Sequence, residues 1–532
     1  MKADQQSATV HVIEEGSLVL PTEPAQAQPA TAEVRTIRDR KFVTAALLLV
    51  MVLVSMEQTI TSTAMPSVIG DLHGLEHYSW VASIYLLACT VTMPLYGRLA
   101  DAFGRKPVIL AALLIFCAAS LLASFATSMT QLILFRGLQG LGAGGVMPVV
   151  LTILADIYTF EERARIQGFF SGVWGTSALA GPALGAVLVK TLGWRSVFWI
   201  NLPIGLFATA VLAWKYHERR ERHEMDLDFP GVASLAIAST LILALVSGMG
   251  PTGWSWTTVS ILSVVSLIAI AFFVRHERRA AHPILPPELV MRREIGPSIL
   301  GSMLFGVGFL SLDTYVPLYI QGGRGGDATA AASVVTPVML TWAMSGLIAA
   351  PAIVRFGFRR VATIGATLIV LGFTGLFACA IAEAPRWMFT ATLAVTGFGF
   401  GPASMSMLIV AQESVDYRQR GIVTSSISFF RTMGGAVGIG LLGALFNMLT
   451  SRDVASLREH GVKPAALLDP HAIAQIPHDV LAQAQHMIAR GLTFVFGAML
   501  IAAVALWCAM RLLPTHQKTT SAVSAADALE VA

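Results

Sequence analysis

The chain has 532 residues, of which 55% are hydrophobic and only 13% are charged, and its formal net charge at pH 7 is +4. Soluble domains carry about 25% charged residues, so the composition excludes an ordinary soluble protein and indicates a helical membrane protein. Its Lys and Arg residues lie mainly in short segments between apolar runs, so we expect no nucleic-acid partner. The four cysteines lie inside apolar runs and form no Cys-x-x-Cys pair or His/Cys cluster, so we expect neither a metal site nor a disulfide framework.

Fourteen apolar segments are long enough to cross a bilayer as helices, and their spacing groups them as six, two and six. The predicted spans are about 42–65, 79–97, 107–128, 132–155, 166–189 and 196–215, then 230–249 and 258–274, then 296–320, 332–354, 361–382, 388–411, 421–447 and 491–512. This order predicts an all-α polytopic membrane protein with two six-helix bundles and a two-helix insert between them.

Charged linkers set the predicted boundaries of these parts. We expect a disordered tail over 1–40, a first bundle over 41–217, an insert with its linkers over 218–290, a second bundle over 291–513 and a second tail over 514–532. The second bundle includes the long connection 451–490, whose Pro, His and Gln content predicts little packed core; 479–489 is its candidate surface helix.

The basic residues predict the orientation. An even number of spans places both termini on one side, and most of the 36 Lys and Arg residues fall in segments on that side, including Arg40, Arg105, Arg278 and Arg360. Short loops that follow the positive-inside rule face the cytoplasm, so we expect both termini to be cytoplasmic.

Glu57 is the first residue that the membrane setting makes unusual. It follows the apolar run 42–54 within the first span, where a charged side chain costs roughly 2.5–3.5 kcal/mol on insertion scales. A carboxyl that faces a polar cavity and exchanges a proton there would explain the cost, and Glu57 is our leading candidate for ion coupling. The alternative is a structural acid that is paired with an arginine.

The segment between the second and third spans, Gly97-Arg98-Leu99-Ala100-Asp101-Ala102-Phe103-Gly104-Arg105-Lys106-Pro107, predicts a latch. Gly97 and Gly104 permit a tight turn, and Asp101 can cap a helix N-terminus and pair with a basic neighbour. We expect this contact to form in one conformation and break in another. The pattern Gly97-x-Leu99-Ala100-Asp101-x-x-Gly104-Arg105-Lys106 resembles the signature loop of the major facilitator superfamily.

Two further stretches carry the same resemblance. Arg136 in the fourth span, in Arg136-x-x-Gln139-Gly140, is similar to an arginine that proton-coupled members tie to proton transfer; the alternative is an arginine that reaches the outer end of its span. In the fifth span, the set Gly168, Ser177, Gly181, Pro182 and Gly185 resembles the antiporter motif of drug exporters, with Ser177 and Ala186 in place of two glycines. General small-residue helix packing is the alternative there.

The resemblance also covers one group within the superfamily and residues in the second half of the chain. Glu57-Gln58-Thr59-Ile60 is similar to the first-span motif of the fourteen-span drug:proton antiporters, with Glu in place of the usual Asp. Asp313 lies in the ninth span, and the resemblance implies that Glu57, Arg136 and Asp313 belong to cavity-lining helices. Arg431, followed by Gly434 and Gly435, is a candidate structural counter-charge.

The resemblance implies a proton-coupled exporter of lipophilic or cationic compounds, with protons, a small lipophilic substrate and the lipid bilayer as partners, in a bacterial cytoplasmic membrane. The sequence contains no Gly-x4-Gly-Lys-Ser/Thr loop, so we expect neither ATP as the energy source nor any cofactor, and nothing indicates an enzyme. The sequence identifies no outer-membrane efflux partner. The alternatives are a dedicated exporter of one metabolite such as a siderophore or secondary metabolite, an uncoupled facilitator, and a non-transporting membrane sensor of the same fold.

Overall fold

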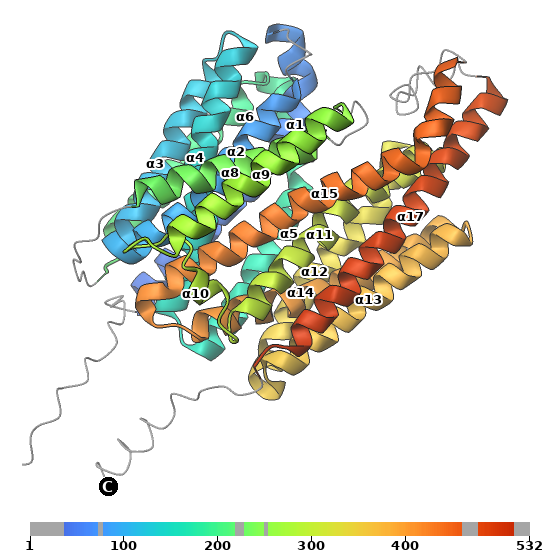
Figure 1. Cartoon of the computed structure of the whole chain (residues 1–532). Coiled ribbons are helices and arrows are strands. Elements are labelled where there is room, and N and C mark those ends of the chain that lie inside the picture. The colour runs from blue at the N-terminus through green and yellow to red at the C-terminus, as the bar shows by residue number, and fades with distance from the viewer. Residues whose placement is uncertain (1–36, 73–77, 219–227, 249–253, 460–476, 515–532) are drawn as a thin grey trace, which may run out of the picture.

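The computed structural model describes residues 37–72, 78–218, 228–248, 254–459 and 477–514 (Figure 1). These residues are almost entirely helical, and none of them forms a strand. Thirteen helices among them are long and apolar enough to cross a membrane. The structure therefore confirms the predicted all-α polytopic fold.

The first half of the chain consists of α1 (Ile37–Leu72), α2 (Tyr78–Phe103), α3 (Arg105–Ser124), α4 (Met129–Ile157), α5 (Phe160–Leu192), α6 (Ser196–Trp199) and α7 (Asn201–Lys215). The short helix α6 continues into α7, and together they form one apolar span over Ser196–Lys215. The insert consists of α8 (Phe229–Gly248) and α9 (Trp256–Glu277).

The second half begins after the short helix α10 (Pro287–Val290). Its elements are α11 (Gly296–Leu318), the π-helical turn η2 (Tyr319–Gly323), α12 (Ala328–Phe356), α13 (Phe358–Ile381), α14 (Arg386–Glu413), the 3₁₀ turn η3 (Tyr417–Gln419), α15 (Arg420–Glu459) and α17 (His478–Arg511).

Helix α5 corresponds to the predicted span 166–189. At 33 residues it is about 50 Å long, enough to cross a bilayer. It packs against α1 of its own half and α12 of the other half. It is therefore one of the helices that connect the two halves.

The two halves contact each other along two helix pairs, α2 with α15 and α5 with α12. The insert lies beside the first pair, because α8 packs against both α2 and α15. Figure 1 shows the two groups of helices converging toward the lower end, near α10, and diverging toward the upper end. We call the lower end the basic end. Helix α1 begins there, α17 ends there, and the turns before α3 and α13 lie there.

Glycine alone connects the helices at two equivalent turns of the basic end. Gly104, with φ of 93°, separates α2 from α3, and Gly357, with φ of 80°, separates α12 from α13. A positive φ of this size is readily adopted only by glycine. The predicted loop 97–107 is therefore almost wholly helical, and Gly97 does not form part of a turn.

Gly97 instead permits a close approach between the two halves. A Cβ at this position of α2 would lie 2.0 Å from Ser425 Oγ and 2.6 Å from the carbonyl oxygen of Gly421, both on α15. Contacts this short are not compatible with a side chain, so glycine is required by packing rather than by backbone conformation.

The described parts of the connection 451–490 are helical. Helix α15 continues to Glu459 and α17 begins at His478, while 460–476 lies outside the described residues. In the first turns of α17, Val480, Ala484, Met487 and Ile488 are buried at helical spacing. This buried stripe joins the candidate surface helix 479–489 to the span as one continuous helix. The predicted tails 1–36 and 515–532 lie outside the described residues.

We predict that Gly97→Val lowers the melting temperature of the full chain, because overpacking a tight helix contact costs about 1–3 kcal/mol. Unfolding is measured with a thiol-reactive dye that reports exposure of the buried Cys89, Cys117 and Cys379. The matched control is Gly70→Val, since a Cβ at Gly70 meets nothing within 4 Å. Equal melting temperatures for the two variants would contradict the packing argument.

Candidate functional site

Glu57 lies in α1 and is held by polar side chains of two other helices. Its Oε1 accepts a hydrogen bond from Arg136 Nη1 of α4 at 2.6 Å, and its Oε2 accepts one from Asn201 Nδ2 of α7 at 2.5 Å. Thr61 Oγ1, one turn further along α1, donates to Oε1 at 3.0 Å. The side chains of Glu57 and Arg136 are 1% and 2% exposed, so both ions are sealed inside the protein.

Further polar and aromatic side chains hold Arg136 and Asn201 in place. Arg136 Nη1 also donates to Gln139 Oε1 at 2.6 Å, and its guanidinium lies over the Tyr85 ring with Cζ 4.2 Å from the ring centroid. Ser120 Oγ of α3 accepts from Gln139 Nε2 at 2.8 Å and from Asn201 Nδ2 at 3.3 Å. The network therefore connects α1, α2, α3, α4 and α7, and it leaves neither ion without a partner.

The burial of Glu57 differs from our expectation of a carboxyl that faces a polar cavity. In this conformation the side chain points into the first six-helix group, because its strongest available partners, Arg136 and Asn201, lie there. The structure thus shows the paired acid of the alternative interpretation. Asn201 and Ser120 were not predicted as site residues. The available signal was a lone Asn at the start of an apolar span.

Asp313 and Arg431, the candidate charged residues of the second half, are not paired as Glu57 and Arg136 are. Asp313 is exposed on α11, and Arg431 is partly buried on α15, where α15 comes so close to α11 that a Cβ at Gly306 would lie 1.9 Å from the Arg431 carbonyl oxygen. Within the described chain, neither side chain makes a hydrogen bond or an ion pair. The structure does not bring Asp313 or Arg431 together with Glu57 and Arg136.

Asp101 connects the two halves at the basic end. Its Oδ1 and Oδ2 accept hydrogen bonds from the backbone N–H groups of Gly421 and Ile422 at 3.0 and 2.8 Å. These are first-turn amides of α15, which have no partner inside their own helix and attract negative charge. Arg105 Nη2 lies 3.1 Å from Asp101 Oδ1 and balances its charge.

Asp156, at the end of α4, holds a second contact between the halves. It accepts from Arg105 Nε at 3.0 Å through Oδ2, and its Oδ1 lies 3.3 Å from Nη1 of Arg420 in the second half. Arg105 Nη2 also donates to the Tyr417 carbonyl oxygen at 2.6 Å, and Arg163 forms an ion pair with Glu413. We call these residues, together with Asp101, the basic-end gate. Their contacts close this end of the molecule.

Glu218, just after α7, supports the gate from the linker. Its two carboxylate oxygens accept the backbone N–H groups of Arg105 and Lys106 at 2.9 Å each, which caps the start of α3. Tyr417 of the second half donates its hydroxyl to Glu218 Oε1 at 3.2 Å. A Cβ at Gly104 would lie 2.7 Å from Glu218 Oε2, which gives the signature glycine a second reason besides its φ. Lys106 itself donates to the Ala213 carbonyl oxygen at 2.7 Å.

The antiporter-like residues of α5 lie on two seams. A Cβ at Gly181 would lie 1.9 Å from Thr59 Oγ1, and one at Gly185 would lie 3.3 Å from the Ile60 carbonyl oxygen, so both glycines pack against α1. A Cβ at Gly168 would lie 2.9 Å from the Gly346 carbonyl oxygen of α12, in the other half. Ser177 is buried, and Pro182 lies inside the helix on an exposed side.

Helix α4 contributes residues to both the Glu57 network and the basic-end gate. Arg136 and Asp156 are twenty residues apart on it, or about 30 Å at 1.5 Å per residue. A displacement of Arg136 along or about the helix axis therefore also moves a carboxylate of the gate. Two six-helix groups that meet at an ion-paired gate, with a buried acid–arginine pair deep in one group, define a multi-pass membrane transporter.

The comparisons with known proteins identify the family. The sequence matches the Major Facilitator Superfamily over residues 47–234 and 230–439, and the chain belongs to this superfamily. It is 33% identical to the multidrug transporter protein MdtP of Bacillus subtilis (strain 168), over 77% of this chain and 75% of that protein. It is 30% identical to multidrug resistance protein 3 of the same organism, over 86% of this chain and 91% of that protein.

A solved structure shows the same fold. The human organic anion transporter MFSD10 (TETRAN) aligns with a TM-score of 0.60 at 15% sequence identity, over 88% of this chain and 100% of that chain. The family match and the two bacterial relatives confirm the resemblance to the superfamily that the sequence motifs carried, and the chain is a transporter of this superfamily.

We predict that Arg136→Met destabilises the protein by about 3–5 kcal/mol, because it leaves Glu57 as a buried charge without its cation. The double variant Glu57→Gln with Arg136→Met removes both charges and recovers most of that loss. Denaturant unfolding of the four proteins in a double-mutant cycle measures the coupling. Additive losses in the double variant would show that the two ions are not energetically paired.

We predict that Glu218→Gln loosens the basic-end gate, since a neutral amide caps α3 and holds Tyr417 more weakly than a carboxylate does. A pair of spin labels placed on α2 and α15 reports the distribution of distances between these helices, which we expect to broaden. Glu288→Gln is the matched control, because Glu288 is an exposed acid at the same end. Identical distributions for the two variants would exclude a role for Glu218 in closure.

Proposed function

We propose that the chain is a proton-coupled exporter of lipophilic or cationic small molecules, of the fourteen-span drug:proton antiporter type. The observation that carries this proposal is the buried Glu57–Arg136 pair. A structural role alone would be filled as well by apolar side chains, which often replace buried ion pairs without loss of stability. An acid with a single close cation inside a membrane protein is suited to exchange that cation for a proton.

The hydrogen bonds suggest how protonation of Glu57 would change the position of Arg136. Protonated Glu57 no longer attracts Arg136 as an anion, while Arg136 keeps Gln139 Oε1 and the Tyr85 face as partners. The Arg136 guanidinium can therefore move away from Glu57 while it keeps its contacts with Gln139 and Tyr85. Since Arg136 and Asp156 share α4, the shift is passed to the contacts of Asp156 with Arg105 and Arg420.

The conformation is consistent with alternating access. The contacts of Asp101, Asp156 and Arg163 with the second half lie at the basic end, which we expect from the positive-inside rule to face the cytoplasm. We infer that this conformation is closed toward the cytoplasm, with both termini on that side of a bacterial cytoplasmic membrane. Protons and lipophilic cargo would then be exchanged with the opposite side, as expected for an exporter that has released its substrate.

The names of the relatives support the cargo class. The two Bacillus subtilis proteins are described as a multidrug transporter and a multidrug resistance protein, and they match most of this chain. Asp313, exposed and without a partner in the described structure, is a second acid that a cationic cargo or a proton could neutralise.

The test is proton-driven uptake of a lipophilic cation, tetraphenylphosphonium, into everted membrane vesicles that contain the full chain. We expect Glu57→Gln to reduce uptake to background and to abolish substrate-dependent proton release from the purified protein, because an amide cannot exchange a proton. Glu288→Gln, an exposed acid outside the network, keeps wild-type transport.

Asp313→Asn separates the two acids in the same assay. Loss of coupling in Asp313→Asn with full coupling in Glu57→Gln would move the coupling role to the second half. Full proton-driven uptake in both single variants and in the double variant would contradict the proposal. Uptake that never exceeds equilibrium in the wild type would indicate an uncoupled facilitator.

A further inference from the structure

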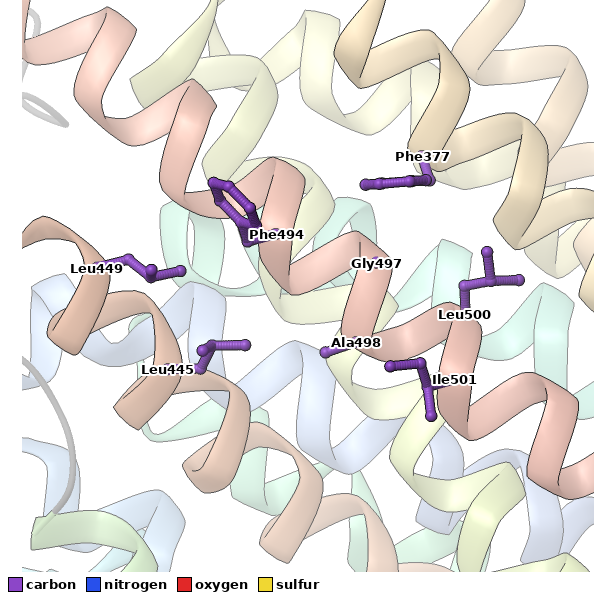
Figure 2. Close-up of a pocket in the computed structure, with 8 residues that line it drawn as sticks. All are labelled: Phe377, Leu445, Leu449, Phe494, Gly497, Ala498, Leu500 and Ile501. Atoms are coloured by element: carbon purple, nitrogen blue, oxygen red, sulfur yellow. The ribbon is translucent and has the colours of Figure 1, made fainter.

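A groove runs along the outer surface of α17, away from the contacts between the two halves. Figure 2 shows it between α17, the α15 residues Leu445 and Leu449, and Phe377 of α13. Its volume is about 440 Å³, and every residue that lines it is apolar. Gly497 and Ala498 are the smallest residues of the α17 face that lines the groove, and Phe494 and Ile501 stand at its two ends. The Phe377 ring lies against Gly497, where a Cβ would be 3.2 Å from Phe377 Cε2.

The charges of α17 place the groove in the bilayer. Arg490 and Arg511 bracket twenty residues without a charged side chain, and their separation along the helix is about 31 Å at 1.5 Å per residue. This distance matches the hydrocarbon thickness of about 30 Å, so the two arginines lie near the two membrane interfaces. Arg511 stands at the basic end, where its guanidinium lies over the Trp507 ring, and Arg490 stands near the opposite interface.

Arg490 is aligned with the groove. Residues 490, 494, 497 and 501 follow the spacing i, i+4, i+7 and i+11, which places them on one face of the helix. From Arg490 to Ile501 the helix rises about 16 Å, the depth of one leaflet. Arg490 is exposed and makes no ion pair or hydrogen bond in the described part of the chain. Arg490, a cation without a partner among the described residues, thus lies near one interface and in line with the apolar groove, which is about as long as one leaflet is deep.

We propose that this groove is a binding site for an anionic phospholipid, with the phosphate at Arg490 and one acyl chain along Gly497. The groove holds no polar side chain, so it offers nothing to a polar cargo, whereas its length and its cation match both parts of a lipid. The site is independent of the gate and of the Glu57 network, and its occupation does not depend on the proposed transport reaction.

The test is native mass spectrometry of the delipidated full chain, titrated with dioleoyl phosphatidylglycerol or with dioleoyl phosphatidylcholine. We expect the first phosphatidylglycerol to bind more tightly than the first phosphatidylcholine. Arg490→Gln should reduce this preference by about fivefold, the contribution of one basic residue at an anionic lipid surface. The matched control is Lys190→Gln, which removes a cation from the exposed end of α5 in the other half and should leave the preference unchanged.

A second variant tests the groove itself. Leu445→Trp fills it and should weaken the first binding step for both lipids, while Leu371→Trp, at a 57% exposed position of α13 outside the groove, should not. Leu449→Trp, at a 39% exposed position that also lines the groove, serves the same purpose if Leu445→Trp does not elute as a single species. Equal effects of Arg490→Gln and Lys190→Gln, or unchanged binding in the groove variants, would overturn the proposal. Displacement of the lipid by tetraphenylphosphonium, with no dependence on Arg490, would assign the groove to cargo and also overturn it.

Discussion

The structure depends on one constraint: an ion placed inside a membrane protein has to find a counter-ion or hydrogen bonds within the protein. The first half meets it at two depths. Deep in the bundle, Glu57 is neutralised by Arg136 and held by Asn201. At the basic end, Asp101 and Asp156 are almost completely buried and share Arg105. Arg136 of the deep pair and Asp156 of the gate both lie on α4. A movement of this helix therefore changes the ion pairs at both depths.

Small residues make these contacts possible. The carboxylate of Asp101 reaches backbone amides of α15 only because Gly97 and Gly421 let α2 and α15 approach closely. In the same way, Gly168 and Gly346 bring α5 against α12. Close backbone approach of this kind depends on shape rather than on strong bonds. An apolar cluster also joins the halves, with Phe429 and Met433 of α15 beside Tyr85 of α2. A gate that closes by a few ion pairs over glycine seams is suited to open and close repeatedly.

The sequence predicted the spans and the capping role of Asp101 because both depend on local patterns. Apolar runs set by bilayer thickness located the helices, and an acid amid basic residues after an apolar span indicated a helix cap. The partners of these residues could not be derived in the same way. Asn201, Ser120 and Glu218 meet Glu57, Gln139 and the start of α3 through tertiary contacts between distant segments, and nothing in their own neighbourhoods specifies the partner.

The burial of Glu57 was mispredicted for a related reason. Periodicity places a residue on a helix face, but only the packing of α1 against its neighbours decides whether that face meets a cavity or Arg136. The helix predicted over 479–489 is present, but its surface position was mispredicted, because its Gln and His residues concealed the stripe of Val480, Ala484, Met487 and Ile488, which the second half buries. In both cases the deciding information was a long-range contact.

The two halves differ in their electrostatic state, and this difference bears on the transport cycle. The ions of the Glu57 network are paired and sealed, whereas Asp313 and Arg431 make no pair with any described residue. An unpaired carboxylate is tolerated at membrane depth only while water reaches it. A conformation that closed the opposite end would remove that water from Asp313, which would then require a proton, a counter-charge or a cationic cargo.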